Sequence, residues 1–204
     1  MIAAPDPPLT DEVVTLRQWE LEDAPTLVEC IDGDEDMTRW MDAIPQPYFD
    51  TEARAWIEQA TSYWHEGTSA PFAVTDAATG SVLGGVGFGW VGDDRVGEIG
   101  YWLRSEARGR GLTVRAVGLV SRWAFTELGC ERLQLRADAD NVASQRVAEK
   151  AGFTREGLLR SVHFNPREQR RVDYVMFSLL PGELEKTRSA SPRRAAQEHG
   201  RRRA

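Results

Sequence analysis

The sequence predicts a mixed α/β domain in which helices pack around one, mostly antiparallel sheet. Three β-rich runs, at residues 71–76, 81–90 and 96–103, are separated by short turn-like connections that are typical of antiparallel hairpins. Helical patterns stand before and after these runs along the chain. The chain has 204 residues, 41% of them hydrophobic, which suffices for one ordinary domain with its own core.

The elements expected before the three hairpin strands are one strand and two helices. Residues 13–19, VVTLRQW, are typical of a strand. Residues 21–31 favour a helix, and Pro25 stands in its first turn, where proline is tolerated. Residues 49–64 have an apolar stripe at helical spacing and predict a second amphipathic helix, with Asp50 as the expected N-cap.

The elements expected after the hairpin strands alternate between helices and strands. The pattern predicts a helix over 114–129, a strand over 132–138, a helix over 141–152 and a closing strand over 173–180. Asn141 is the expected cap of the last helix, and Gly129 and Gly152 mark the ends of the two helices.

Charge divides the chain into an acidic body and a basic tail. The formal net charge is −7, although residues 186–204 carry seven Lys or Arg and one acidic residue. We expect an N-terminal extension (1–11), one domain (12–181) and a disordered tail (182–204), because the tail has almost no large apolar side chains. The acidic body argues against a nucleic-acid-binding fold and suits a cationic substrate such as an amine. The tail is either a contact with RNA or another polyanion, or a solubilising extension.

No stretch of the sequence has the features of a membrane span or an export signal. No apolar run approaches the roughly 18 to 20 residues of a span, and the first ten residues lack a basic region followed by an apolar one. We therefore expect a cytoplasmic protein that does not contact membranes. Cys30 and Cys130 stand alone, without a CxxC or Cys/His cluster, so the sequence indicates neither a disulfide nor a metal site.

A glycine loop, RGRGLT at residues 108–113, precedes the helix at 114–129 and has the features of a phosphate site. Nucleoside triphosphate loops require Gly-Lys-Ser/Thr, which is absent from the sequence. Dinucleotide folds require a third glycine, where this loop has Val114, and a preceding βαβ strand rather than a hairpin strand. A pyrophosphate bound by the loop and the helix N-terminus is the interpretation that remains.

This loop resembles the phosphate loop of the GNAT acyltransferases, and three other segments extend the resemblance to the RimJ/RimL subgroup. They are LRQWELEDAPTL, NVASQRVAEKAGFTREGLLR and the closing DYVMFSLL, which occur in family order and cover about residues 12 to 181. The resemblance implies the GNAT fold, with helices on both faces of the sheet, and binding of acetyl-CoA without a metal. The implied cofactor residues are Leu103, Arg108, Gly109, Arg110, Gly111, Leu112, Thr113 and Asn141. Thr113 departs from the usual Gly or Ala, and we expect it to tune binding rather than abolish it.

The resemblance also implies a general acid and two candidates for the base. Many GNAT enzymes protonate the departing thiolate with a tyrosine at the position of Ala148, which cannot do so here, whereas the RimJ/RimL pattern offers Ser144. Glu98, on the strand before the loop, and His163, on the segment after Glu156-Gly157, are the candidate bases; ordered water is the alternative.

The acceptor amine is the part of the reaction that the sequence leaves open. The subgroup acetylates N-terminal amines of ribosomal proteins, while small amines, such as aminoglycosides, polyamines or amino-acid derivatives, and a non-catalytic CoA-binding sensor are alternatives. Residues 34–50 stand where the family has its acceptor-binding helix and loop, so Asp34, Glu35, Asp36 and Asp42 are expected to attract a cationic amine.

Of the seven tryptophans, we expect Trp40 and Trp90 near the acceptor, and Trp56, Trp64, Trp102 and Trp123 in the core. Monomer and homodimer are both open.

Overall fold

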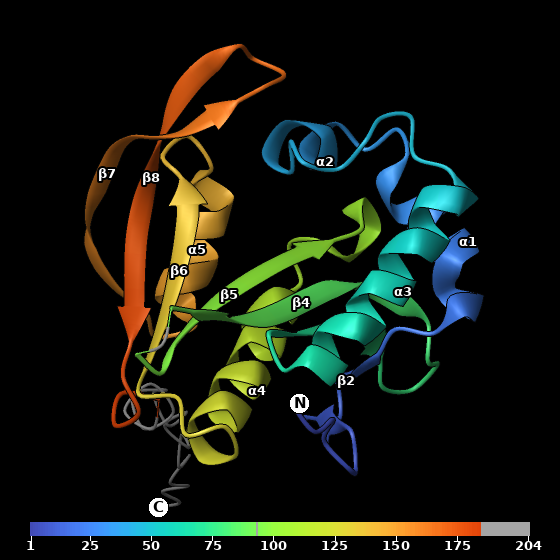
Figure 1. Cartoon of the computed structure of the whole chain (residues 1–204), viewed down its shortest axis with the longest axis horizontal. Coiled ribbons are helices and arrows are strands. Elements are labelled where there is room, and N and C mark those ends of the chain that lie inside the picture. Colours follow the sequence, from blue (N-terminus) through green and yellow to red (C-terminus); the bar gives the residue numbers. More distant parts are fainter. Residues whose placement is uncertain (93, 185–204) are drawn as a thin grey trace, which may run out of the picture.

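The computed structural model describes residues 1–92 and 94–184, which form one mixed sheet in the order β1-β2-β3-β4-β5-β6-β8-β7 (Figure 1). Neighbouring strands are antiparallel except β5 and β6, which are parallel. The predicted mixed, mostly antiparallel sheet is therefore confirmed. The strands are β1 (Leu9–Thr10), β2 (Val14–Gln18), β3 (Ser69–Asp76), β4 (Val82–Val91), β5 (Val96–Leu103), β6 (Arg132–Asp138), β7 (Thr154–Asn165) and β8 (Arg170–Leu179).

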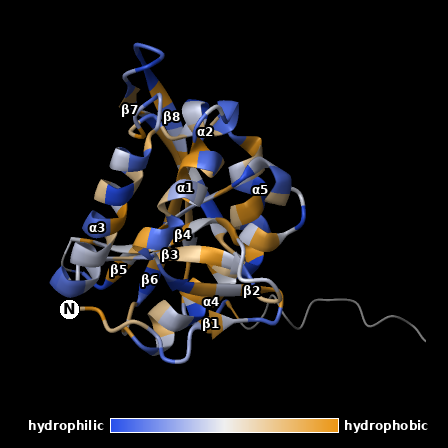
Figure 2. Cartoon of the chain, turned by 90° about the vertical axis from the view of Figure 1, so that its right-hand side faces the viewer, coloured by the Kyte–Doolittle hydropathy of each residue, from blue (hydrophilic) through white to orange (hydrophobic). Residues whose placement is uncertain are grey.

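Helices cover both faces of this sheet, as the GNAT fold requires. They are α1 (Ala24–Ile31), α2 (Glu35–Trp40), α3 (Asp50–Glu66), α4 (Leu112–Thr126) and α5 (Val142–Lys150), with single 3₁₀ turns at Leu21–Asp23 and Ser105–Ala107. Val117 of α4 shares one hydrophobic cluster with Phe88 of β4, while Leu27 of α1 and Ile57 of α3 share another with Ala73 of β3. Figure 2 shows α3 carrying both hydrophilic and hydrophobic residues, as expected for a helix with one face on the sheet.

The helix ends lie close to the sequence signals, although α4 runs over Leu112–Thr126 instead of 114–129 and α1 begins at Ala24 after a 3₁₀ turn. Asn141 caps α5, since its side chain accepts a hydrogen bond from the Ser144 backbone N–H at 2.9 Å. α3 begins one residue earlier than expected: Phe49 is its N-cap, and Asp50 lies in the first turn, where a carboxylate stabilises the helix dipole. Gly67, with φ of +77°, ends α3 in the left-handed conformation that glycine adopts at little cost.

The parallel strands β5 and β6 separate after a short paired stretch. Their register runs from Val96 opposite Arg132 to Glu98 opposite Gln134 and ends there. Beyond Glu98, β5 continues beside β4, and β6 continues beside β8. The sheet therefore opens into a wedge, visible between β5 and β6 in Figure 1, and the carboxyl halves of both strands border it.

Three elements were not specified by the sequence patterns: β1, α2 and the long edge strand β7. The N-terminal residues pack on the domain, because β1 pairs with β2 and Ile2 is buried. In the part of the chain that the structure describes, no helix is both long and apolar enough to cross a membrane. The predicted tail, residues 182–204, lies outside the described residues except for its first three.

Candidate active site

The glycine loop forms an open turn at the beginning of α4. Gly109 and Gly111 have φ of +74° and +76°, and a Cβ at either position would meet no atom within 4 Å. Gly111 is the N-cap of α4, whose first amide groups have no acceptor inside the helix. Glycines with free space beside them and unpaired helix amides together suit a diphosphate. Leu103 and Leu112 are buried beneath this turn, Thr113 is half-buried and Arg110 is exposed.

The guanidinium of Arg108 is bonded to protein groups, so binding the cofactor is not its only role. Its Nε donates to the Leu103 carbonyl at 3.0 Å, Nη1 donates to Asp36 at 2.9 Å and Nη2 donates to Asp34 at 2.6 Å. Asp34 also caps α2, because its other oxygen accepts the Met37 N–H at 3.0 Å. Arg108 thus ties the glycine loop to α2.

Ser144 bridges the mouth of the wedge together with Tyr101. The Tyr101 Oη and the Ser144 Oγ are 2.9 Å apart, and Tyr101 also donates to the Ser144 carbonyl at 3.0 Å. Burial raises the pKa of Tyr101 to about 12, so its hydroxyl keeps its proton at neutral pH. A tyrosine hydroxyl has one proton, so while Tyr101 donates to the Ser144 carbonyl, Ser144 Oγ is the donor to Tyr101 Oη.

Glu98 lies at the last position where β5 pairs with β6, and both of its carboxylate oxygens accept hydrogen bonds. Arg136 donates to Oε2 at 2.8 Å and to Oε1 at 2.7 Å, and Gln134 donates to Oε2 at 2.7 Å. The hydrogen bond to Glu98 raises the pKa of Arg136. Protonation of Glu98 would break a bidentate pair, so this carboxylate is better placed to orient Arg136 than to accept a proton.

His163, on β7, forms a pair with Asp42, which follows α2 in the chain. Its Nε2 is 2.7 Å from the Asp42 Oδ2, and its ring stacks on Tyr174 with centroids 5.5 Å apart. Arg167, in the β7–β8 turn, donates to the backbone carbonyls of Thr38 and Ile44. The hairpin and the α2 segment therefore hold each other over the wedge.

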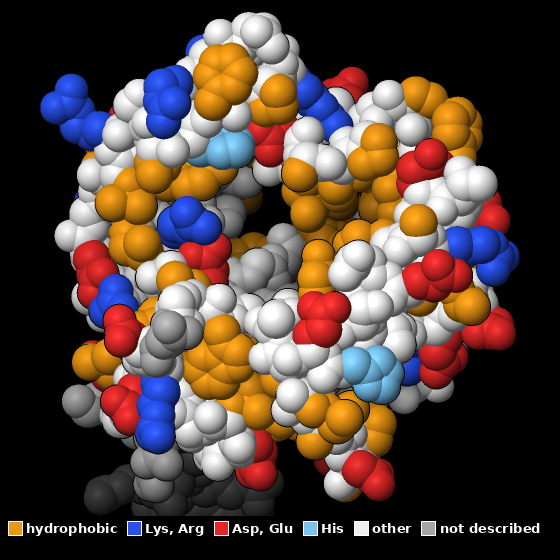
Figure 3. Space-filling model, in the orientation of Figure 1, with side chains coloured by type: hydrophobic (Ala, Val, Ile, Leu, Met, Phe, Trp, Pro, Cys, Tyr) orange, Lys and Arg blue, Asp and Glu red, His pale blue; other side chains and the backbone are white. Residues whose placement is uncertain are grey.

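These groups enclose one reaction cavity. It has a volume of about 310 Å³, and its lining includes Ser144, Asn141, Glu98 and His163. Figure 3 shows the hollow between α2, the β7–β8 hairpin and β5. The structure thus brings the acid, both candidate bases and Asn141 together, whereas residues 108–113 lie beyond the carboxyl end of β5 and do not line this cavity.

Tyr101 and Arg136 line this cavity and were not among the predicted site residues. Tyr101 had a signal, because it alternates with Ile99 and Leu103 on the strand face toward α4 and is a polar group in an apolar series. Arg136 had none, since a strand arginine is ordinarily a solvated residue. Among residues 1–92 and 94–184, no three His, Cys, Asp or Glu side chains gather into a metal site.

A splayed parallel strand pair, an open glycine turn beside it and a pair of hydroxyls at the opening suit an acyl transferase that uses a phosphate-bearing acyl carrier. Comparisons with known proteins specify this class. A family model described as the acetyltransferase (GNAT) domain matches residues 14–154. The uncharacterized N-acetyltransferase p20 of Bacillus licheniformis is 32% identical over 177 residues, which are 86% of this chain and 97% of that protein.

Solved structures agree with the family match in fold. The ribosomal-protein-S5-alanine acetyltransferase from Vibrio fischeri has a TM-score of 0.73 at 20% identity, covering 85% of this chain and 96% of that one. The microcin C7 self-immunity acetyltransferase MccE, solved with acetyl-CoA and AMP, also has a TM-score of 0.73 at 20% identity, covering 86% and 99%. The chain belongs to the GNAT acetyltransferase family and is an acetyl-CoA-dependent N-acetyltransferase. The predicted family, enzyme class and acetyl donor are confirmed.

Proposed function

We propose that the acceptor is the α-amine at the N-terminus of a protein, such as a ribosomal protein. One observation carries the proposal: the three carboxylates that line the reaction cavity all accept hydrogen bonds from protein groups. Glu98 is bonded to Arg136, Asp42 to His163, and Asp138 to the backbone N–H of Asp140. An α-amine has a pKa of ~8, whereas an alkylammonium has a pKa of ~10.4. A weaker base is therefore sufficient to deprotonate an α-amine.

The chain's own residues divide the work between two sides of the wedge. Acetyl-CoA, when bound, supplies the thioester from which the acetyl group is transferred. Gly109 and Gly111, with the first amides of α4, hold its diphosphate, because these groups present N–H donors without side chains in the way. Ser144 Oγ holds a proton for the departing sulfur, and Tyr101 passes its hydroxyl proton to Ser144 Oγ while taking up one from solvent water.

His163 is the base in this proposal, and Glu98 is a positioning residue. Asp42 accepts a hydrogen bond from Nε2–H of the imidazole, which leaves Nδ1 with the lone pair that takes the ammonium proton, directly or through water. Glu98 holds Arg136 at the wall of the cavity. The pair of Asp42 and His163 joins α2 to β7, so the base is assembled only when both segments are in place.

The test is a thiol-release assay with acetyl-CoA and a matched pair of peptides. One peptide has a free α-amine and no lysine; the other has the same sequence with a blocked N-terminus and one internal lysine. We expect acetylation of the first peptide and little of the second. Faster turnover of the lysine peptide, a polyamine or an aminoglycoside would overturn the proposal, and no release with any acceptor would favour a CoA-binding module.

A further inference from the structure

A groove of about 700 Å³ continues the reaction cavity across the sheet, and its floor is bare backbone. Gly87, Gly89 and Gly100 line it. At Gly84 and Gly97 a Cβ would collide with neighbours, so packing explains those two glycines. At Gly87 the nearest atom to an added Cβ is 3.9 Å away, and at Gly100 no atom lies within 4 Å. Packing therefore gives no reason for glycine at Gly87 or Gly100, whereas at Gly85, which also lines the groove, an added Cβ would lie 2.7 Å from the indole nitrogen of Trp102.

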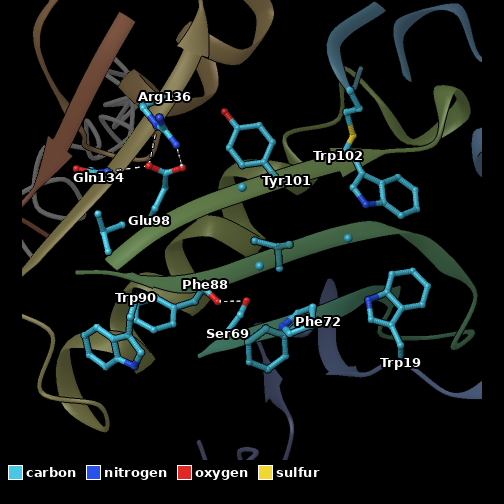
Figure 4. A pocket seen from close by; sticks show the side chains of 18 of the residues that line it. Trp19, Ser69, Phe72, Phe88, Trp90, Glu98, Tyr101, Trp102, Gln134 and Arg136 are labelled. Atoms are coloured by element: carbon cyan, nitrogen blue, oxygen red, sulfur yellow. Dashed lines mark hydrogen bonds and ion pairs between the residues drawn. The ribbon is translucent and has the colours of Figure 1, made fainter. Parts of the chain in front are cut away.

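One end of the groove is a wall of three tryptophans. Trp19 stacks on Trp102 with centroids 6.0 Å apart and meets Trp56 edge-on at 5.3 Å. The rings contact one another, so they leave no cage between them for a cation. Figure 4 shows the nitrogen edges of Trp19 and Trp102 turned toward the groove. Sequence patterns had assigned Trp56 and Trp102 to the core, but both are half-buried and line the groove.

Trp19 carries a buried donor without a partner. Its side chain is 5% exposed, and no described group accepts a hydrogen bond from its Nε1–H. A buried N–H without an acceptor has lost its hydrogen bond to water, so a ligand oxygen that accepts from it would remove that penalty. The edge of an indole ring is also its positive region, which attracts oxygen atoms and disfavours ammonium groups.

The groove carries no net charge from its lining. Among the described residues that line it, Glu98 and Arg136 are the charged ones, and they pair with each other. Of the acidic residues expected to attract a cationic acceptor, Asp34 and Asp36 pair with Arg108 and Asp42 pairs with His163, while the exposed Glu35 does not line the groove. A polycation such as a polyamine therefore finds no free carboxylate along this surface.

We propose that this groove binds the second and third residues of the acceptor polypeptide as an extended, uncharged segment, with a peptide carbonyl accepting from Trp19 Nε1–H. This inference rests on the proposed function. The groove and the reaction cavity share lining residues, among them Gly100 and Tyr101, so a chain with its α-amine at Ser144 continues directly onto the floor. From Glu98 to Trp102, β5 spans about 13 Å, which is room for roughly three extended residues.

The experiment compares steady-state kinetics for peptides that share their first residue and differ at positions two and three. We expect kcat/KM for neutral residues at these positions to exceed that for two lysines or two glutamates by about tenfold or more, because each charge would be desolvated without a partner. The enzyme variant is Gly87→Val, which fills the floor at a strand position whose φ is negative. Gly157→Val, at another open strand glycine outside the groove, is its control.

We expect Gly87→Val to raise the KM for the neutral peptide about tenfold with unchanged acetyl-CoA affinity, and Gly157→Val to change neither. Trp19→Phe keeps an aromatic ring and removes the donor, and we expect a several-fold loss of kcat/KM with a melting temperature that does not fall by more than a few degrees. Acetylation of peptides regardless of these two residues, with normal KM in Gly87→Val, would overturn the inference and leave the proposed function standing. Absence of peptide acetylation altogether would instead refute the proposed function.

Discussion

The two sides of the active site are built in different ways. On the side proposed to bind acetyl-CoA, one short stretch of chain, residues 104–113, presents main-chain groups and glycines at the beginning of α4. On the acceptor side, pairs of side chains join distant parts of the sequence: Arg136 with Glu98, and His163 with Asp42. The acetyl-CoA side therefore depends on local conformation, whereas the acceptor side depends on the whole fold and can change its specificity by exchanging single side chains.

The largest effect is expected from filling the main-chain site. Gly111→Trp places a large side chain in the open space of the turn, at a φ of +76° that disfavours any residue with a Cβ. We expect acetyl-CoA affinity to fall more than about 100-fold, so that the cofactor no longer raises the melting temperature. Isothermal titration and thermal unfolding with and without acetyl-CoA measure this.

Gly129→Trp is the matched control for that substitution. Gly129 also has a positive φ, +64°, and no atom within 4 Å of an added Cβ, but it lies at the other end of α4. It therefore carries the same backbone strain without contacting the turn. Unchanged affinity in Gly111→Trp, or an equal loss in both variants, would contradict a diphosphate site at this loop.

The second effect tests the hydroxyl pair at the mouth of the wedge. Ser144→Ala removes the acid, and we expect kcat to fall roughly 10- to 1,000-fold with little change in acetyl-CoA affinity. Alanine is a good helix former, so the variant should be at least as stable as the wild type. Full activity would leave water or another group as the proton source.

Tyr101→Phe separates the two hydroxyls. If Tyr101 only replaces the proton on Ser144, its loss should lower kcat less than Ser144→Ala does, and the double variant should be no slower than Ser144→Ala alone. With its pKa raised to about 12, Tyr101 stays protonated below that pH. Any fall of kcat between neutral pH and about pH 10 must therefore come from another group.

Much of the fold and the loop side of the site follows from the sequence, for a physical reason. β5 and β6 have the predicted bounds, and Asn141 caps its helix as expected, because strand alternation, caps and glycine turns are properties of neighbouring residues. α2 was not specified by pattern: it has six residues, and its cap Asp34 also serves Arg108, 74 residues away. Contacts at that separation exist only after the chain has folded.

The difference between local signals and contacts made only in the folded chain also explains which features of the acceptor side were not predicted. Glu98 and His163 were predicted as alternative bases from their places in the chain and their side-chain chemistry. Nothing local indicates that Arg136 occupies both oxygens of Glu98 or that Asp42 is bonded to His163. Trp56 has the spacing of a core residue on α3, and it lines a groove because the sheet opposite carries glycines instead of side chains.

The third effect, on the acceptor side, is expected for His163→Gln. Glutamine keeps a hydrogen-bond donor for Asp42 and cannot titrate, so we expect kcat/KM for a peptide to fall about 10- to 100-fold. Steady-state kinetics with the free-α-amine peptide measure this, and an unchanged kcat/KM in the variant would show that His163 is not the base.

The smallest effect is expected where the two sides meet, at Arg108. This guanidinium is bonded to Asp34 and Asp36 and is itself partly exposed; the side-chain exposures are 32% for Arg108, 59% for Asp36 and 10% for Asp34. Pairs of this kind contribute about 0.2 to 1 kcal/mol, so Arg108→Gln should raise the acceptor KM by about two- to fivefold through a loosened α2, while acetyl-CoA affinity stays within about twofold. Asp34→Asn should produce a similar KM, and the double variant should add little, because both changes break the same contact.

A large loss of acetyl-CoA affinity in Arg108→Gln but not in Asp34→Asn would show that the arginine leaves α2 for the diphosphate when the cofactor binds. The two sides would then be coupled by exchange of one cation rather than by a fixed brace.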